Sequence, residues 1–197
     1  MIEIKALYKK FGKNVIFENL HLVLNLGKIY GLVGKNGIGK TTLFNCMAGF
    51  EKYEGNIVIS EVNKDKISFM GVDLYSYPRI RGIEFLISAL EIRNISTTKN
   101  TIENIFFLPL NEYAENYSTG MKKKLYLQII LLIADQIILL DEPFEGLDAD
   151  SIDILVEALK KIKENKHIII SSHRLDTLNK ISDSIIKIES KNTVKIL

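Results

Sequence analysis

Apolar and polar positions alternate through much of the first third of the chain, and a period of two predicts strands. Strands are predicted at 2–7, 21–26, 28–34, 56–60 and 66–70. The run at 28–34 is short, apolar and ends in glycine. A helix is predicted to begin at 39–41 and to run to Met47 or Ala48, where Gly49 stops it. This part of the chain is therefore rich in strands.

The pattern changes between 74 and 116. Pro78, Gly82 and Pro109 punctuate this stretch, and apolar residues recur at helical spacing within 83–92. We interpret about 74–116 as a mostly helical insert within one domain that covers 1–197.

Helical and strand patterns alternate in the remainder of the chain. Helices are predicted at 119–134, 149–164 and 174–180, and strands at 136–141, 167–171, 184–189 and 192–197. This alternation is typical of an α/β fold, with a mostly parallel sheet covered by helices on both faces.

Composition narrows the functional classes. The 197 residues carry a formal net charge of +2, and the charges are interleaved, so no electrostatic feature favours nucleic acid as a partner. Cys46 is the single cysteine, which excludes an internal disulfide and a multi-cysteine zinc site, and we expect it to be buried.

The N-terminus is too charged for a secretory signal. The apolar stretch 125–140 is interrupted by polar residues and fits a buried helix and strand better than a membrane span. We therefore expect a cytoplasmic protein.

The segment from Gly34 to Thr41 matches the phosphate-loop pattern G-x-x-x-x-G-K-[ST] in full, between an apolar strand and a helix. Its backbone N–H groups can surround phosphates, and Lys40 should reach the β- and γ-phosphates. The Thr41 hydroxyl should hold Mg²⁺, and Thr42 should lie beside the α-phosphate. The predicted nucleotide-binding residues here are Gly34, Lys35, Asn36, Gly37, Ile38, Gly39, Lys40, Thr41 and Thr42.

Two adjacent carboxylates follow a buried strand at 137–140. Asp141 should hold Mg²⁺ through water, and Glu142 should polarise the attacking water. His173 ends another strand, where an imidazole can hydrogen-bond the γ-phosphate and the water. Glu142, His173 and Lys40 are thus the predicted catalytic residues. His21 and His167 lack such a position, and we interpret them as structural or exposed.

These features together resemble the ATP-binding subunit of ABC transporters. The resemblance rests on GKNGIGKTT (34–42), YSTGM (117–121), IILLDEP (137–143), EGLD (145–148) and SSH (171–173). It extends over essentially the whole chain, in matching order and approximate spacing. It implies a P-loop NTPase core with an N-terminal antiparallel β portion and a helical subdomain.

The resemblance also implies that two copies enclose two ATP molecules. Ser118 and Gly120, at the start of a helix, would bind the γ-phosphate held by the partner's phosphate loop. Asp148 would link the two sites across the dimer. Phe11, followed by Val15, is similar to the aromatic that stacks on adenine, and Tyr8 is the alternative for that role.

The chain departs from the family pattern at several positions. Thr119 and Met121 replace a glycine and a glutamine in the signature, a variant that resembles the exporter subtype. No glutamine follows the strand at 66–70, and Asp73 is the candidate to replace it at Mg²⁺. Glu145 stands where the family commonly has a serine.

The resemblance therefore implies an ATPase that uses ATP and Mg²⁺. The ATPase would drive a membrane-spanning transporter subunit in a separate chain, as a homodimer or heterodimer on the cytoplasmic face of the membrane, and export is the expected direction. The alternatives are a nucleotide-gated regulator with weak turnover and a non-transport relative that acts on DNA or ribosomes. A GTPase is a further alternative. Its guanine-reading pattern is only partly matched by 63–66, which we interpret as a turn between strands.

Overall fold

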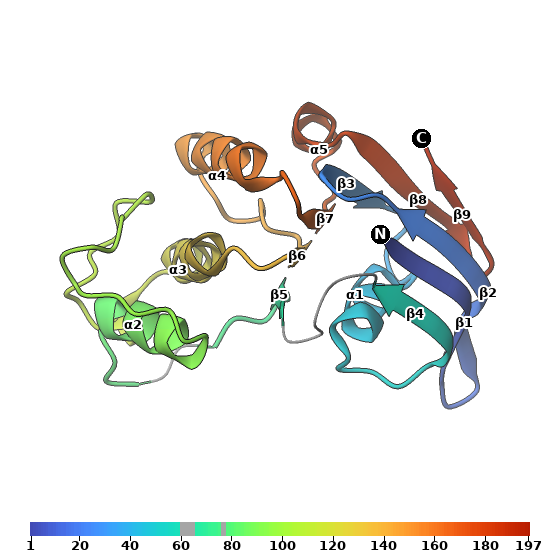
Figure 1. The fold of residues 1–197 in the computed structure, drawn as a ribbon, viewed down its shortest axis with the longest axis horizontal. Helices are drawn as coiled ribbons and strands as arrows, with labels where there is room; N and C mark the ends of the chain where they lie inside the picture. Colours follow the sequence, from blue (N-terminus) through green and yellow to red (C-terminus); the bar gives the residue numbers. More distant parts are fainter. Residues whose placement is uncertain (60–65, 76–77) are drawn as a thin grey trace.

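The computed structural model describes residues 1–59, 66–75 and 78–197, which form two β-sheets and surrounding helices (Figure 1). The predicted turn at 63–66 lies mainly outside the described residues. The larger sheet has the strand order β5-β6-β7-β3-β8-β9. Its strands are β3 (Lys28–Val33), β5 (Ile67–Met70), β6 (Ile137–Asp141), β7 (His167–Ser171), β8 (Ser184–Ser190) and β9 (Thr193–Ile196). All neighbours pair in parallel except β8 and β9.

The smaller sheet is antiparallel and has the order β2-β1-β4. Its strands are β1 (Ile2–Phe11), β2 (Asn14–Leu24) and β4 (Glu54–Ile59). The first two strands form a hairpin longer than the sequence predicted, because the pairing continues through register shifts that interrupt the alternation. The antiparallel N-terminal portion is thus confirmed.

The parallel sheet is covered on both faces. Helix α1 (Lys40–Ala48) and the smaller sheet pack on one face, and α3 (Thr119–Ile133), α4 (Ala149–Ile162) and α5 (Leu175–Ile181) pack on the other (Figure 1). Alternate residues of β6 serve the two cores: Ile137 and Leu139 face α1, and Ile138 and Leu140 face α3. Continuous burial of β6 and β7 explains their unbroken apolar sequences.

The insert contains less helix than predicted. Its described residues hold α2 (Gly82–Ile92) and one 3₁₀ turn, η2 (Ala114–Asn116). The residues between them form an irregular segment, in which the Asn104 side chain exchanges hydrogen bonds with the backbone of Leu108. α2 packs against α3, where the rings of Phe85 and Tyr126 meet edge to face at 5.5 Å. The mostly helical interpretation of about 74–116 therefore needs correction, because much of this stretch is a loop that the hydrogen bonds of the Asn104 side chain stabilise.

The stretch 125–140 folds as the end of α3 followed by β6, as predicted. None of the helices in the described ranges is long and apolar enough to cross a membrane. Cys46 is buried on α1, and burial raises the pKa of its thiol to about 11. It packs as a small apolar side chain, as the sequence indicated.

Candidate functional site

A cleft of 310 Å³ opens where β3, β6 and β7 end. Ligands bind at this edge of parallel sheets, because the loops that follow the strands converge there. Its lining consists of Asn36, Gly37, Gly39, Lys40, Thr41, Thr42, Val72, Asp141, Glu142 and His173. The structure therefore brings the phosphate loop, both strand-end carboxylates and the histidine to one place.

The phosphate loop owes its shape to glycines and to packing beneath it. Gly37 and Gly39 have φ of 75° and 115°, which side chains rarely adopt. A Cβ at Gly39 would lie 2.6 Å from Ile16 and 2.8 Å from Phe17, so only glycine lets the loop rest on β2. Lys40 is largely buried, and its Nζ donates to the carbonyl oxygen of Gly34 at 3.0 Å. The loop thus holds its own ammonium group inside the cleft.

Two hydroxyls hold the Asp141 carboxylate. Thr41 Oγ1 donates to Oδ2 at 2.5 Å, and Ser171 Oγ donates to Oδ1. The register explains the second bond, because Asp141 pairs with Ser171 across β6 and β7. This arrangement leaves Asp141 ordered and directed toward the phosphate loop.

Hard oxygen donors of this kind suit Mg²⁺. Thr41 and Asp141 would hold the ion, directly or through water, and Mg²⁺ would neutralise phosphate charge. Among the residues that the structure describes, no group of three or more His, Cys, Asp and Glu side chains forms a metal cage. The remaining ligands would therefore be phosphate and water oxygens, as is usual for Mg²⁺ at nucleotides.

Glu142 is held in an unusual backbone conformation with φ of 50°. Such a conformation costs about 1 kcal/mol or more in a non-glycine residue and is common at functional sites. Its N–H donates to Ser171 Oγ at 3.0 Å, and its carbonyl accepts from Lys123 Nζ at 3.0 Å. These contacts fix the direction in which the carboxylate leaves the strand.

The side chains of Glu142 and His173 meet in the cleft. The backbone N–H of His173 donates to Glu142 Oε2 at 3.1 Å, and the ring Nε2 of His173 lies 3.2 Å from Glu142 Oε1. The second contact lacks hydrogen-bond geometry, so Oε1 is buried without a hydrogen-bond partner among the described residues. A buried carboxylate oxygen with unused acceptor capacity can accept a hydrogen bond from water.

The start of α3 is a second polar site, separate from this cleft. Ser118 caps the helix, its Oγ accepts from the Met121 N–H at 3.2 Å, and it is exposed. A Cβ at Gly120 would lie 2.8 Å from the carbonyl oxygen of Gly146. Neither Ser118 nor Gly120 lines the 310 Å³ cleft. Free backbone N–H groups at a capped helix start attract anions.

Asp148 caps α4 close to the same place. Its Oδ1 accepts from the Ser151 N–H at 2.8 Å, and its Oδ2 lies 2.7 Å from Lys124 Nζ on α3. The hydrogen bond from Lys124 and those from Ser151 hold the pKa of Asp148 well below its usual range. The N-terminal ends of α3 and α4 are therefore linked by a charged pair.

The predicted adenine contacts lie on the hairpin of β1 and β2. Phe11 is 45% exposed, and the Lys9 ammonium lies 4.4 Å from its ring centroid. Val15 is half-buried nearby, opposite Lys10. Tyr8 lines a different, shallow pocket together with Lys52, Tyr53 and Glu54.

Asp73 remains a prediction as a metal ligand. It is exposed and does not line the cleft, where its neighbour Val72 does.

Two contributors to the site were missed from the sequence. Ser171 holds both Asp141 and the Glu142 N–H, and its position at the end of a strand next to β6 was the available signal. Lys123 bonds the carbonyl oxygens of Glu142 and Glu145, and burial lowers the pKa of its ammonium. Lys123 stands in the run 122–124 of three lysines, and nothing in the sequence indicated that one of them would be buried.

A family model described as "ABC transporter" matches residues 17–145 of this chain. Among curated proteins, the chain is 30% identical to the lantibiotic transport ATP-binding protein SrtF of Streptococcus pyogenes. That similarity covers 94% of this chain and 85% of the relative. It is 28% identical to the ABC transporter ATP-binding protein YtrB of Bacillus subtilis, over 100% of this chain and 72% of the relative. A methionine import ATP-binding protein, MetN of Clostridium tetani, is 25% identical over 97% of this chain and 67% of the relative.

Solved structures share the fold. An ATP-binding subunit of an ABC transporter superimposes with a TM-score of 0.89 at 22% identity, over 100% of this chain and 90% of the other. The ATP-binding cassette MJ0796, a dimer in a post-hydrolysis state with ADP and phosphate, gives a TM-score of 0.84. Its identity is 19%, over 100% of this chain and 98% of the other.

Proposed function

Because this chain belongs to the ABC transporter family of ATP-binding subunits, we propose that it hydrolyses ATP as one half of a dimer. The two halves would enclose two ATP molecules with Mg²⁺. The dimer would drive a separate membrane-spanning subunit from the cytoplasmic face of the membrane. Thr41 and Asp141 hold Mg²⁺ in this proposal, Lys40 holds the β- and γ-phosphates, and Glu142 with His173 orients the attacking water.

One observation carries the dimer. The phosphate cleft contains the acids and Lys40, whereas Ser118 and Gly120 lie at a helix start outside that cleft, where Ser118 is exposed. A helix start that suits an anion but lies outside the cleft is explained if it closes over the γ-phosphate held by another copy. Phosphate between the two surfaces attracts both, and its release removes that attraction.

Mixing two inactive variants tests this arrangement. Lys40→Ala removes the phosphate contact and keeps the start of α3, whereas Ser118→Arg blocks the start of α3 and keeps the loop. Each variant alone should be nearly inactive. An equal mixture should recover about a quarter of the wild-type rate, because half the dimers are mixed and each has one intact site of two.

Recovery on mixing requires that Lys40 and Ser118 of one active site come from different chains. If the mixture is as inactive as its components, although both variants still form mixed dimers by size, the proposed site between copies is wrong. A variant with both changes in one chain is the matched control. Mixed with an equal amount of wild type, it should leave about a quarter of the rate of an all-wild-type sample, because its mixed dimers contain no intact site and only wild-type homodimers remain active.

The membrane subunit has a suitable surface on this chain. A groove of 650 Å³ lies between the end of α1 and the pair α2 and α3, and is lined largely by apolar side chains. Phe50 and Ile92 line it and are 71% and 80% exposed. Exposed aromatic and aliphatic residues around a groove suit an amphipathic cytoplasmic helix of a partner.

Affinity purification from native membranes tests the groove. Phe50→Ser should reduce recovery of a co-purifying membrane-spanning protein at least about tenfold, since apolar anchors dominate such interfaces. Phe107→Ser is the matched control, because Phe107 is 84% exposed and lies outside the groove. Equal loss with both variants, or loss with neither, would count against this docking site.

Export is the proposed direction. It rests on the signature variant at 117–121 and on the similarity to a lantibiotic transport protein. The similarity to a methionine import protein makes direction the point to test. Once the membrane subunit is identified, vesicles with this chain on the outer surface should accumulate substrate when ATP is added outside. ATP-driven loss of preloaded substrate would indicate import.

A further inference from the structure

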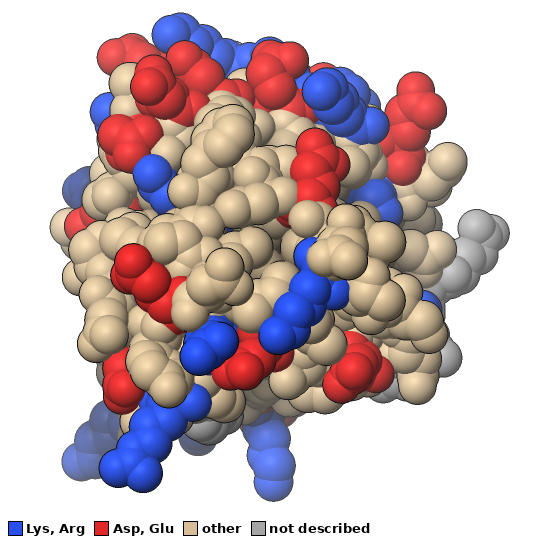
Figure 2. Space-filling model, turned by 90° about the vertical axis from the view of Figure 1, so that its left-hand side faces the viewer, with Lys and Arg blue, Asp and Glu red and all other residues tan. Residues whose placement is uncertain are grey.

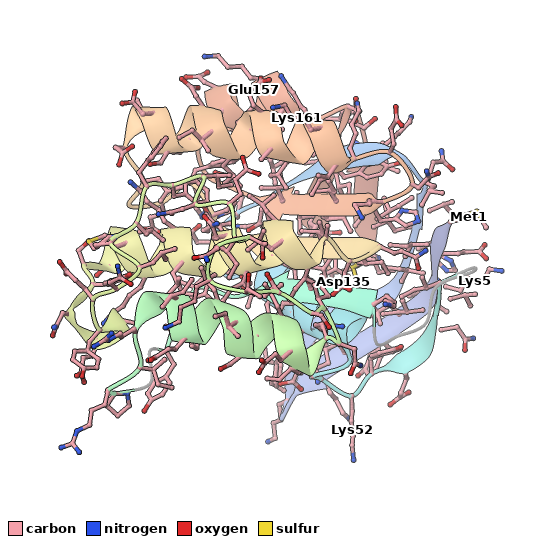
Figure 3. The ribbon with its side chains drawn as sticks, turned by 60° about the vertical axis from the view of Figure 1, so that its left-hand side comes forward. Met1, Lys5, Lys52, Asp135, Glu157 and Lys161 are labelled. Atoms are coloured by element: carbon pink, nitrogen blue, oxygen red, sulfur yellow. The ribbon has the colours of Figure 1, made fainter. Side chains whose placement is uncertain are left out.

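A further cavity lies on the side of α3 that faces away from α2. It has a volume of 530 Å³ and lies between α3 and α4, with residues 103–105 beside it. Figures 1 and 3 show α3 between α2 and α4, and in Figure 3 the irregular segment of the insert lies in front of these helices. The apolar lining of the cavity consists of Ile105, Leu131, Leu132, Ile154, Ala158 and Ile162. This volume is within the range of small-molecule sites.

A buried amide faces this cavity without full hydrogen bonding. Gln128 on α3 is 0% exposed, and its Nε2 donates to the carbonyl oxygen of Glu103. Its Oε1 is buried and has no hydrogen-bond partner among the described residues. A buried amide oxygen without a donor is destabilising by about 1–3 kcal/mol. Gln128 lines the cavity, so a ligand with an N–H group would satisfy this acceptor once the Gln128 side chain turned toward it.

The mouth of the cavity is acidic. Glu103, Asp153 and Glu157 line it and are exposed, and Lys161 is the one cation in the described lining. Figure 3 shows Glu157 and Lys161 projecting from α4, and Figure 2 shows acidic side chains along the upper edge of this face with basic ones between them. An excess of carboxylates favours a cationic ligand over an anionic one.

We propose that this cavity binds a small amphipathic amine. The apolar part of the ligand fills the space between α3 and α4. The amine remains near the carboxylates of the mouth and donates a hydrogen bond toward Gln128 Oε1. Neither part of this site takes part in nucleotide binding, because the cavity and the phosphate cleft share no lining residue.

Occupancy should also affect the ATP sites, an inference that rests on the proposed function. α3 begins beside Ser118, α4 is capped by Asp148, and Lys124 joins the two at 2.7 Å. A ligand between the C-terminal half of α3 and the α4 residues from Asp153 to Ile162 would change the spacing of the two helices. The two capped ends would then move relative to the nucleotide of the partner copy.

Calorimetric titration of the purified chain tests binding. The probes are decylamine, decanoate and butylamine, all below micelle-forming concentrations. Decylamine should bind one site. Decanoate, with the same chain length and the opposite charge, and butylamine, with the head but little apolar area, should each bind at least about tenfold more weakly. Equal affinity of decylamine and decanoate would overturn the assignment of a cationic ligand.

Exposed charges provide variants that should fold normally. Glu157→Lys reverses a charge of the mouth and should weaken decylamine binding at least about fivefold. Glu164→Lys is the matched control, because it changes the net charge equally at an exposed position outside the lining. If both variants weaken binding equally, the amine binds elsewhere and the proposal is wrong.

Filling the cavity gives an independent test. Ala158→Trp should abolish decylamine binding, and Lys160→Trp, on the exposed side of α4, should not. The sequence has no tryptophan, so fluorescence of each variant reports its own site and confirms folding. Unchanged binding to Ala158→Trp would refute the cavity as the site.

The effect on activity is measured separately. Saturating decylamine should change the ATPase rate of wild type at least about twofold and leave Ala158→Trp unaffected. Binding without a change in rate would overturn the regulatory part and leave the ligand site intact. Failure of the mixed-variant experiment above would affect the dimer and not the calorimetric result, so the two proposals fail independently.

Discussion

His173 lies against Glu142 in the phosphate cleft, with its backbone N–H 3.1 Å from one carboxylate oxygen and its ring Nε2 3.2 Å from the other. The carboxylate is thus oriented from β7 while it extends from the end of β6. A group fixed in this way can position a water molecule without reorganising during the reaction.

Glu142→Gln should test this role directly. The amide keeps the shape and loses the negative charge, so we expect phosphate release to slow by about 10²–10⁴-fold, or 3 to 5 kcal/mol of barrier. ATP binding should persist, and the variant should form a dimer in Mg²⁺-ATP by light scattering. Glu145→Gln is the control, because its side chain is exposed and only its carbonyl is used. A normal rate in Glu142→Gln would exclude Glu142 as the base.

Gly120→Ala should separate ATP binding from hydrolysis. The added Cβ would lie 2.8 Å from the Gly146 carbonyl oxygen, so the start of α3 must shift away from the loop before α4. We expect the ATPase rate to fall at least about tenfold, whereas the affinity of the monomer for ATP stays within about twofold. Thr119→Ala, at an exposed neighbouring position, should retain activity. Equal activity of the two variants would show that this close approach is not required.

Replacing Phe11 and Tyr8 separately should identify the aromatic that contacts adenine. If Phe11 stacks on the base, Phe11→Ala should raise the Kd for ATP about fivefold to a hundredfold, which matches the 1–3 kcal/mol of a stacked base. Tyr8→Ala should have little effect, and tripolyphosphate, which lacks a base, should bind both variants equally. The reverse pattern between the two variants would assign the role to Tyr8.

His167 should make stability fall in mild acid. Burial, and secondarily the charge of the N-terminus, lowers its pKa from 6.5 to about 4. The unfolded chain therefore takes up a proton near pH 6.5, whereas the folded chain takes it up only near pH 4. The free energy of unfolding should decrease as pH falls through that window, by about 2 kcal/mol at pH 5, and level off below pH 4.

Urea unfolding at pH 7.5 and pH 5 measures this effect. His167→Leu should remove most of the difference between the two pH values, because leucine does not titrate and an apolar side chain suits a fully buried position. His21→Leu is the control, since His21 is exposed. If the pH dependence survives in His167→Leu, another group causes it.

The local elements were largely predictable. Strand and helix positions followed from periods of two and 3.6, and the closing pair β8 and β9 lies where the apolar pattern placed it. The N-terminal hairpin was underestimated because bulges break the alternation. The insert was overestimated as helix because hydrogen bonds of one side chain, Asn104, stabilise a loop that periodicity does not detect.

The sequence by itself determined the phosphate loop, the two strand-end acids and the order of the elements, because each is encoded in a continuous stretch of residues. Only the tertiary structure decided that β6 lies beside β7, which brings Ser171 to Asp141 and His173 to Glu142. It also decided the approach of Gly120 to Gly146 and the cavity beside Gln128. Strand order and helix packing depend on the whole core, since they bury apolar faces from distant parts of the chain together, and no local pattern specifies them.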